Sequence, residues 1–407
     1  MKILMIEDFF HPQAGYQLNV LCPYLVKFGH DVTIICGEME LFPDYLTSFF
    51  GKDNISDNDD KFTRETGVNI IRVPVKKYIS GRAIFDNSIY ENVEKQKPDI
   101  IYVHGNDTFT GMQFILKQAK FKVPLISDTH MVELASNNRF AKIFRWGYKN
   151  YITPKIKKYN NFVIRTVEDP FVMKWYNIPE EQAPVIGFGS DTLRFQPSCD
   201  MKTKMRKELG VDDNDIVVIY AGKLDEYKGG SFLATAIKDK FDLAEISIKF
   251  LIIGNVSGEK AEETSKLLEQ SNNIVIRRPT QPYPELAKWF QAADVAVFPK
   301  QCSLTYYDVL ACGLPVLVED NPIGLQRAKE CEAASTFKAG DVGNFRKRLS
   351  ELVCSVAEER KKTSEDMSLS EKAIRYIKEN YDYEKQARRY EEVILKVIEN
   401  YNKSQKG

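Results

Sequence analysis

The feature that most constrains this chain is a regular alternation of short β-branched runs with amphipathic stretches of helical spacing, and it occurs twice. The first series contains five predicted strands: Ile3–Ile6, Val32–Cys36, Ile100–His104, Leu125–Asp128 and Val163–Val167. The second contains five more: Ile216–Ala221, Ile248–Ile253, Ile274–Arg277, Val295–Phe298 and Pro315–Val318. Apolar strands separated by helices are typical of parallel sheets covered on both faces. The pattern therefore predicts an α/β chain with two doubly wound domains.

Helical spacing also marks individual helices. Leu18, Leu21, Cys22 and Leu25 form one apolar stripe, and a long polar-faced helix is expected from about residue 384 onward. The Gly/Pro-containing segment 184–197 interrupts the pattern and predicts a linker near 188–200. The polar segment Lys52–Lys61 is expected to be a loop.

Composition excludes several classes of protein. The 57 basic residues balance 57 acidic ones, which argues against a nucleic-acid partner, because such binding needs many Lys/Arg contacts to phosphate. No apolar run approaches the ~20 residues that span a bilayer. Seven scattered cysteines without a C-x-x-C pair favour reduced thiols over disulfides or zinc, and we expect a cytoplasmic protein.

Two motifs follow strands of the second series. In Tyr220–Gly230 a glycine turn at Gly222 is followed by Lys223 and Lys228 before a helix, an arrangement suited to a diphosphate; a solvated loop is the alternative. After Phe298, the backbone amides of Ser303 to Thr305, Leu304 included, are candidate phosphate donors. Asp308 lies in the first turns of the next helix, where it could accept sugar hydroxyls or simply cap the helix.

The first series offers two candidates. Gly15 lies in the turn before the first helix, where free amides bind anions, although an ordinary turn is the alternative. His130 follows the strand Leu125–Asp128 and would donate a hydrogen bond to a sugar hydroxyl or to developing charge. A structural histidine is the alternative there.

With these motifs in place, the chain resembles a family 4 retaining glycosyltransferase of the GT-B fold. The resemblance rests on Gly222-Lys223…Lys228-Gly229, on the strand end Ile252-Ile253-Gly254, and on two longer stretches, 292–299 and 308–316. It implies two Rossmann-like domains facing a cleft, an acceptor-side domain 1–188 and a donor-binding domain 189–383. It also implies that the terminal helix, about 384–407, crosses back to the first domain.

The same resemblance implies site roles. Lys223 and Lys228 would bind the diphosphate, Asp308 the ribose, and His130 would be the acceptor-side catalytic histidine. Donor-binding positions would be Gly15, Gly222, Gly254, Arg277, Lys300, Gln301, Ser303, Leu304 and Thr305. No metal and no other cofactor is expected, because lysines can neutralise the leaving diphosphate. One departure matters most: Lys300 or Gln301 stands where the family has an acid near the donor sugar.

The function that follows is transfer of a sugar, with retention, from a nucleotide-diphospho-sugar to a hydroxyl of a saccharide or lipid-linked acceptor. UDP is favoured over GDP. A catalytically silent nucleotide-sugar-binding or scaffold protein is the alternative, and a GT-B epimerase or phosphorylase lacks the expected signals. Residues 139–158 carry seven basic side chains, several aromatic ones and no acid, which predicts contact with an anionic membrane; a solvated helix with its aromatics in the core is the alternative.

Overall fold

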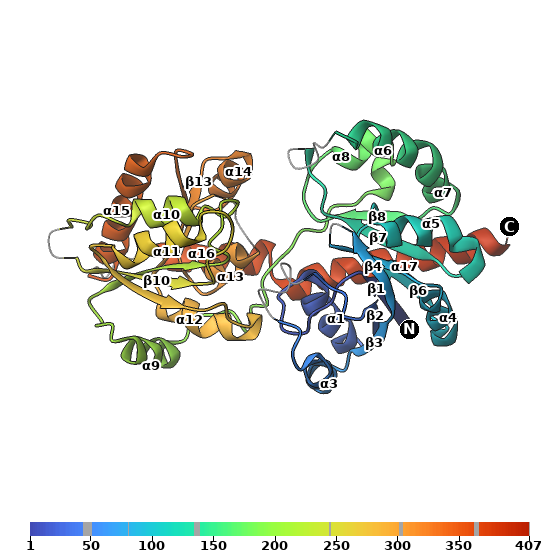
Figure 1. Cartoon of the computed structure of the whole chain (residues 1–407), viewed down its shortest axis with the longest axis horizontal. Helices are drawn as coiled ribbons and strands as arrows, with labels where there is room; N and C mark the ends of the chain where they lie inside the picture. Colours follow the sequence, from blue (N-terminus) through green and yellow to red (C-terminus); the bar gives the residue numbers. More distant parts are fainter. Residues whose placement is uncertain are drawn as a thin grey trace. The chain divides into compact units, whose positions relative to one another are not determined.

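The computed structural model describes residues 1–43, 51–79, 81–133, 139–243, 246–300, 304–361 and 366–406. It divides into two compact units. Unit 1 comprises Met1–Phe188 together with Tyr383–Gly407, and unit 2 comprises Gly189–Asp382. Each unit is built around its own six-stranded sheet (Figure 1).

The sheet of unit 1 is parallel, with the order β3-β2-β1-β6-β7-β8. Its strands are β1 (Lys2–Glu7), β2 (Asp31–Gly37), β3 (Asn69–Val73), β6 (Ile100–Val103), β7 (Leu125–Thr129) and β8 (Phe162–Arg165). A separate antiparallel hairpin pairs β4 (Val75–Ile79) with β5 (Arg82–Phe85).

The helices of unit 1 connect these strands. They are α1 (Gln17–Lys27), α3 (Ile55–Thr66), α4 (Ser88–Gln96), α5 (Phe109–Phe121), α6 (Ala141–Gly147), a π-helical turn (Tyr148–Ile152), α7 (Thr153–Lys158), α8 (Phe171–Tyr176), a 3₁₀ turn (Glu180–Gln182) and α17 (Tyr383–Lys406). The predicted stripe of α1 is buried in full, and α17 buries Tyr383, Ala387, Tyr390, Ile394 and Val397. Gln17 of α1 donates to the Tyr390 hydroxyl of α17 at 2.9 Å, so the last helix of the chain packs beside the first.

The sheet of unit 2 repeats the topology, with the order β11-β10-β9-β12-β13-β14, and it too is parallel. Its strands are β9 (Ile216–Ala221), β10 (Ile248–Ile253), β11 (Ile274–Arg278), β12 (Val295–Phe298), β13 (Val316–Glu319) and β14 (Ala334–Phe337). Its helices are α9 (Cys199–Leu209), α10 (Gly230–Ala236), α11 (Ala261–Glu269), a 3₁₀ turn (Tyr283–Glu285), α12 (Leu286–Ala292), α13 (Thr305–Ala311), α14 (Pro322–Glu330), α15 (Val342–Glu359) and α16 (Leu369–Asn380).

Side-chain alternation along the strands of unit 2 builds two cores, one on each face of the sheet. Val217 and Ile219 of β9 pack with α9, α12, α13 and α16, whereas Ile216 and Val218 pack with α10, α11 and α15. Strands buried on both faces need apolar residues at every position, which is why they read as unbroken β-branched runs. All ten predicted strands are present, and the doubly wound α/β class is confirmed.

Two features differ from the prediction. The segment Lys52–Lys61 was expected to be a loop, but most of it lies in α3. One apolar side chain anchors this polar helix: Phe62 packs edge-on against Phe10, with 5.5 Å between ring centroids. The edge strands β3 and β14 were not predicted, because their partly exposed faces interrupt the apolar run.

Candidate functional site

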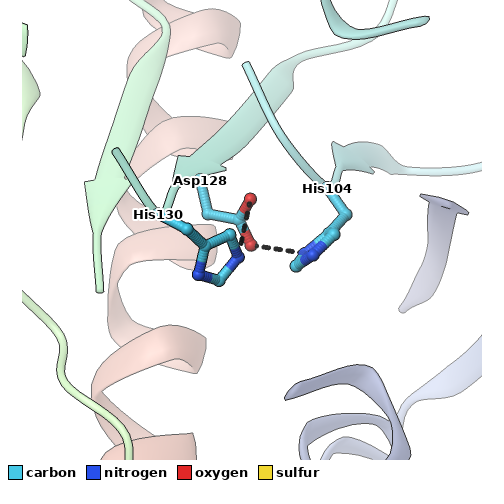
Figure 2. A group of neighbouring side chains, drawn as sticks. All are labelled: His104, Asp128 and His130. Atoms are coloured by element: carbon cyan, nitrogen blue, oxygen red, sulfur yellow. Dashed lines mark hydrogen bonds and ion pairs between the residues drawn. The ribbon is translucent and has the colours of Figure 1, made fainter. Parts of the chain in front are cut away.

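A cluster of ionisable side chains lies at the carboxyl ends of three adjacent strands of unit 1. Glu7 ends β1. His104 follows β6, and Asp128 and His130 lie at the end of β7 (Figure 2). The Nδ1 atom of His104 is 2.9 Å from Oδ2 of Asp128, and its Nε2 atom is 3.5 Å from Oε2 of Glu7. The His104 imidazole therefore lies between two carboxyl groups. Its 15% side-chain exposure keeps the interactions largely out of water.

Asp128 is the centre of this network. Its carboxylate is fully buried and accepts hydrogen bonds from the Tyr102 hydroxyl at 2.9 Å, from the Gly105 amide at 2.7 Å and from His104. Burial opposes its ionisation, but the positive charge and hydrogen bond of His104 hold the pKa of Asp128 well below its usual range. Burial likewise disfavours charge on His104, yet Asp128 and Glu7 raise the pKa of His104 to about 9. A buried imidazolium–carboxylate pair results.

His130, the predicted catalytic histidine, is the exposed member of the cluster, with 36% of its side chain accessible. Its Nδ1 atom lies 3.0 Å from the Thr166 hydroxyl, and its ring stacks on Phe188 with 5.6 Å between centroids. Burial of the ring and the charge of His104 outweigh the attraction of Asp128 and lower the pKa of His130 to about 4. The lowered pKa favours the neutral imidazole.

The spacing of His104, Asp128 and His130 approaches that of metal ligands, with the nearest donor atoms all within 4.8 Å of one another. The electrostatics of His104 argue against such use. Its raised pKa favours the doubly protonated imidazole, which has no lone pair for a metal ion. We therefore assign no metal to the cluster.

Sequence reasoning singled out His130 and missed Glu7, His104 and Asp128. The missed signal was the topology: β1, β6 and β7 are neighbours in the sheet, so polar residues at their carboxyl ends must converge. Gly15, the other candidate of unit 1, lies one residue before Tyr16, which caps α1 through a hydrogen bond from its amide to Asn19. Its proposed contact with phosphate stays a prediction.

In unit 2, the loops after β9 and β10 contact each other through the backbones of two glycines, Gly222 and Gly254. A Cβ atom on Gly254 would lie 1.9 Å from the carbonyl oxygen of Gly222. The following loop is shaped by Asp225, whose carboxylate accepts from the Lys228 amide at 2.8 Å and whose carbonyl accepts from the Gly230 amide at 2.8 Å. This glycine contact and the Asp225 turn bring the backbone segments that carry Lys223 and Lys228 to the carboxyl edge of the sheet.

A hollow of about 240 Å³ opens at the same edge, between the loops after β9 and β12, where the strand order reverses. Lys300 lines it and donates to the carbonyl of Glu226 at 3.2 Å. The other lining residues are Glu226, Gly229, Ser231, Phe232, Lys260, Pro299, Glu319 and Gly340. Lys223, Lys228 and Asp308 are not among them, so the structure does not gather the three in this hollow.

Asp308 occupies a different setting from the one predicted. Only 1% of it is exposed; its Oδ1 atom accepts from the Ser190 hydroxyl at 2.7 Å and from the Tyr283 hydroxyl at 3.3 Å. Burial raises the pKa of Asp308 to about 7 despite these two bonds. A carboxyl group so enclosed ties α13 to Ser190, and its predicted contact with a ribose stays a prediction.

The remaining donor-binding candidates divide into three groups. Arg277 points to α11, where its guanidinium donates to Ser265 at 3.2 Å and lies 3.7 Å from Glu269, so its side chain is engaged away from Gly254. Thr305 begins α13 and Leu304 is its N-cap residue, and their proposed contact with phosphate stays a prediction. Gln301 and Ser303 lie outside the described residues.

Two protein-family models match this chain, one in each of its two units. The family described as Glycosyltransferase Family 4 matches residues 15–167, and the family described as Glycosyl transferases group 1 matches residues 215–355. D-inositol 3-phosphate glycosyltransferase of Pseudarthrobacter chlorophenolicus is 33% identical over 148 residues, 34% of this chain and 34% of that protein. The same enzyme of Corynebacterium jeikeium is 24% identical over 251 residues, 58% of this chain and 59% of its own. The matched stretches thus cover between about a third and three fifths of these relatives.

Solved structures match across the whole chain. A glycosyltransferase of Rickettsia africae has a TM-score of 0.70 at 13% identity, covering 98% of this chain and 99% of its own. HepE of Anabaena, in complex with UDP and glucose, has a TM-score of 0.68 at 14% identity, covering 97% of this chain and 100% of its own. At such identities the likeness establishes a shared GT-B fold. No helix in the described part of the chain is long and apolar enough to cross a bilayer.

Proposed function

We propose that this chain, which belongs to the family 4, group 1 glycosyltransferases, moves a sugar from a nucleotide-diphospho-sugar to a hydroxyl group, with retention at the anomeric carbon. The donor is a UDP-sugar in the first instance and a GDP-sugar in the second. The acceptor is a saccharide or lipid-linked hydroxyl, and the relatives named for inositol 3-phosphate add a polyol phosphate to the acceptors worth assaying.

One observation carries the donor half of this proposal. The bare backbone contact between Gly222 and Gly254 lies in unit 2 at the carboxyl edge of the sheet, where open α/β sheets bind ligands. The segment that begins at Gly222 also carries Lys223 and Lys228. Absent side chains permit close approach of a ligand, and lysines supply the charge that a diphosphate requires. A fold neighbour, HepE, has been crystallised with UDP-glucose, which supports a UDP-sugar as the first donor to test.

The proposed chemistry needs no protein nucleophile. Lys223 and Lys228 stabilise the departing diphosphate, and a phosphate oxygen of that leaving group takes the proton of the acceptor hydroxyl as the new glycosidic bond forms. His130 contributes hydrogen bonding to the reacting sugar. Catalysis then consists of positioning and electrostatic stabilisation.

The test combines binding with turnover. A thermal-shift panel of nucleotide sugars identifies the donor, since a ligand at ~100 times its dissociation constant stabilises by ~2.7 kcal/mol. With that donor, Lys228→Ala should lower turnover roughly 10²-fold, because one charge-assisted contact in a transition state is worth on the order of 2–4 kcal/mol. Lys240→Ala, an exposed lysine of the same unit, is the matched control. An unchanged rate in Lys228→Ala would remove the diphosphate assignment.

The rival function is a catalytically silent nucleotide-sugar-binding or scaffold protein. Its support is Lys300, whose ammonium group occupies the wall of the hollow where the family has an acid. Donor-dependent stabilisation without release of nucleotide, across the full acceptor panel, would favour it over transfer.

We also propose that α6 and the following turns dock unit 1 on an anionic membrane. Five large side chains are exposed there: Phe140 at 59%, Ile143 at 72%, Phe144 at 39%, Trp146 at 61% and Tyr151 at 63%. Tyr148 and Ile152 instead fill the core, so the aromatic residues divide between the two faces of this helical segment. Exposed apolar side chains among seven basic ones match the interface of an anionic bilayer.

Flotation with liposomes tests the membrane contact. Wild-type protein should float with vesicles containing anionic lipid and much less with neutral ones, and Ile143→Ser with Trp146→Ser should reduce recovery several-fold. Leu395→Ser, at another exposed apolar position of unit 1, is the control. Equal recovery on both vesicle types would contradict the idea.

A further inference from the structure

The ionisable cluster of unit 1 pairs its groups in an unexpected way. Asp128 lies near two imidazoles, and the usual expectation is that a carboxylate orients the exposed, substrate-facing histidine. Here it bonds to the buried one: His104 is at 2.9 Å, whereas Nε2 of His130 is 3.9 Å from the nearest Asp128 oxygen, beyond hydrogen-bond range.

We propose that His104 is a positioning residue whose buried positive charge, added to the burial of the His130 ring, keeps His130 neutral with its proton on Nδ1, so that the bare Nε2 of His130 accepts a hydrogen bond from a substrate hydroxyl. This inference rests on the proposed function, because it assigns the proton state in which the site would meet a sugar. It concerns the hydrogen-bonding direction of His130 and adds no covalent step.

The tautomer follows from counting protons at Thr166. The Thr166 hydroxyl donates to the Thr129 carbonyl at 3.0 Å, and a carbonyl can only accept. A hydroxyl has one proton, so when that proton goes to the Thr129 carbonyl, the 3.0 Å contact with Nδ1 of His130 runs the other way, with the imidazole donating. In the neutral ring the second nitrogen, Nε2, then carries a lone pair.

Among the described residues, no hydrogen bond engages Nε2 of His130. Oδ1 of Asp128, 3.9 Å away, is a second acceptor, so the two atoms face each other with no proton of their own to share. The Asp128 carboxylate already receives three hydrogen bonds, from Tyr102, Gly105 and His104. A hydroxyl proton from outside the protein satisfies Nε2 in a way that none of these groups does.

His104 supplies the electrostatic bias. Its ring centroid is 4.7 Å from that of His130, so an imidazolium there opposes a second positive charge on His130. The other ionisable groups of the cluster come from several elements: Glu7 from β1, Asp8 directly after it, Arg82 from β5, Asp107 after β6, and Asp128 from β7. Arg82 acts in the same direction as His104, and Asp128 acts against them.

Nuclear magnetic resonance of histidine-labelled protein tests the inference directly, because the chain has only four histidines. In the wild type, the ¹⁵N signals at neutral pH should show a bare Nε2 on His130 and two protonated nitrogens on His104. In His104→Gln, which keeps a hydrogen-bond donor toward Asp128 but removes the charge, the pKa of His130 should rise above about 4 yet stay below its ordinary ~6.5, because burial of the ring, the larger cause of the shift, remains. His30→Gln, elsewhere in unit 1, should leave the titration of His130 unchanged.

Two results would overturn the inference: a protonated Nε2 on neutral His130 in the wild type, or a His130 titration that does not respond to His104→Gln. The first measurement needs no variant, so it stands even if His104→Gln fails to fold. Neither needs substrate, so a failed transfer assay with the expected titration would refute the proposed function while leaving the histidine pairing intact. If transfer is observed, the acidic limb of its pH profile should move to higher pH in His104→Gln.

Discussion

Replacement of the buried Asp308 by asparagine should change how the stability of unit 2 depends on pH. Burial raises the pKa of this carboxyl from 3.8 to about 7, although Ser190 and Tyr283 both donate to it. A raised pKa means that its contribution to stability is complete below pH ~4 and is lost as the pH rises through 7. At ~1.4 kcal/mol for each pKa unit, the full loss is on the order of 4 kcal/mol.

Asparagine keeps the acceptor oxygen and cannot ionise, so its stability should not show this loss. The substitution also buries an amide NH₂ group, a cost of about 1–3 kcal/mol that does not depend on pH. This constant term cancels when the same pair of proteins is compared at two pH values. Between pH 4.5 and 7.5 the free energy of unfolding of Asp308→Asn should therefore gain about 3 kcal/mol on that of the wild type.

Urea unfolding followed by tryptophan fluorescence measures this difference. The chain has three tryptophans, and only Trp289 lies in unit 2, with 4% exposure in its core. In a background of Trp146→Phe and Trp175→Phe, the signal reports on unit 2 alone. Parallel curves of stability against pH, with and without Asp308→Asn in this background, would refute the argument, since they would mean that the carboxyl titrates normally in the fold.

Asp294 provides a control of opposite sign in the same unit. It is 6% exposed and contacts Lys202 at 2.7 Å, Arg206 at 3.0 Å and Arg360. Burial opposes its charge, but these cations lower its pKa, so its contribution is present above the unfolded pKa and lost as the pH falls. Asp294→Asn should destabilise by about 3–5 kcal/mol at pH 7, because Arg206 stays buried, and less at pH 4.

Two further substitutions test local packing by thermal unfolding. Gly254→Ala should destabilise the protein by several kcal/mol and lower the yield of folded protein, because its Cβ atom would clash with the Gly222 carbonyl. Gly210→Ala is the control. Its Cβ atom would meet nothing within 4 Å, so it should cost only about 1 kcal/mol of stability, for the positive φ. Comparable losses at the two glycines would show that the loops after β9 and β10 do not meet as described. Arg72→Lys should destabilise the protein by about 1–3 kcal/mol and speed proteolysis of α3. Lysine cannot reproduce the two hydrogen bonds of 2.6 and 2.8 Å that the guanidinium donates to Asp59. A lysine variant as resistant to protease as the wild type would mean that this pair does not hold α3.

The candidate site was only partly predictable from sequence. His130 was found because it directly follows an apolar strand, and the same rule applied to Glu7 and His104 would have found the rest of the cluster. What no spacing reveals is which imidazole pairs with Asp128. That depends on the distance from Asp128 to each imidazole, 2.9 Å for His104 and 3.9 Å for His130. The attraction between a carboxylate and a protonated histidine weakens with distance, so such a difference decides which histidine holds the extra proton.

Hydrophobic patterning alone predicted the two parallel sheets, ten of their twelve strands and the terminal helix, because strands buried on both faces carry apolar residues in unbroken runs. Tertiary packing decided the environments of the polar residues. The sequence does not distinguish an Asp308 that caps a helix in water from one that is buried beside Ser190 and Tyr283. Only the packing of the surrounding chain determines its burial. Lys300 and Asp225 likewise acquire their roles from loops that meet across strands distant in sequence.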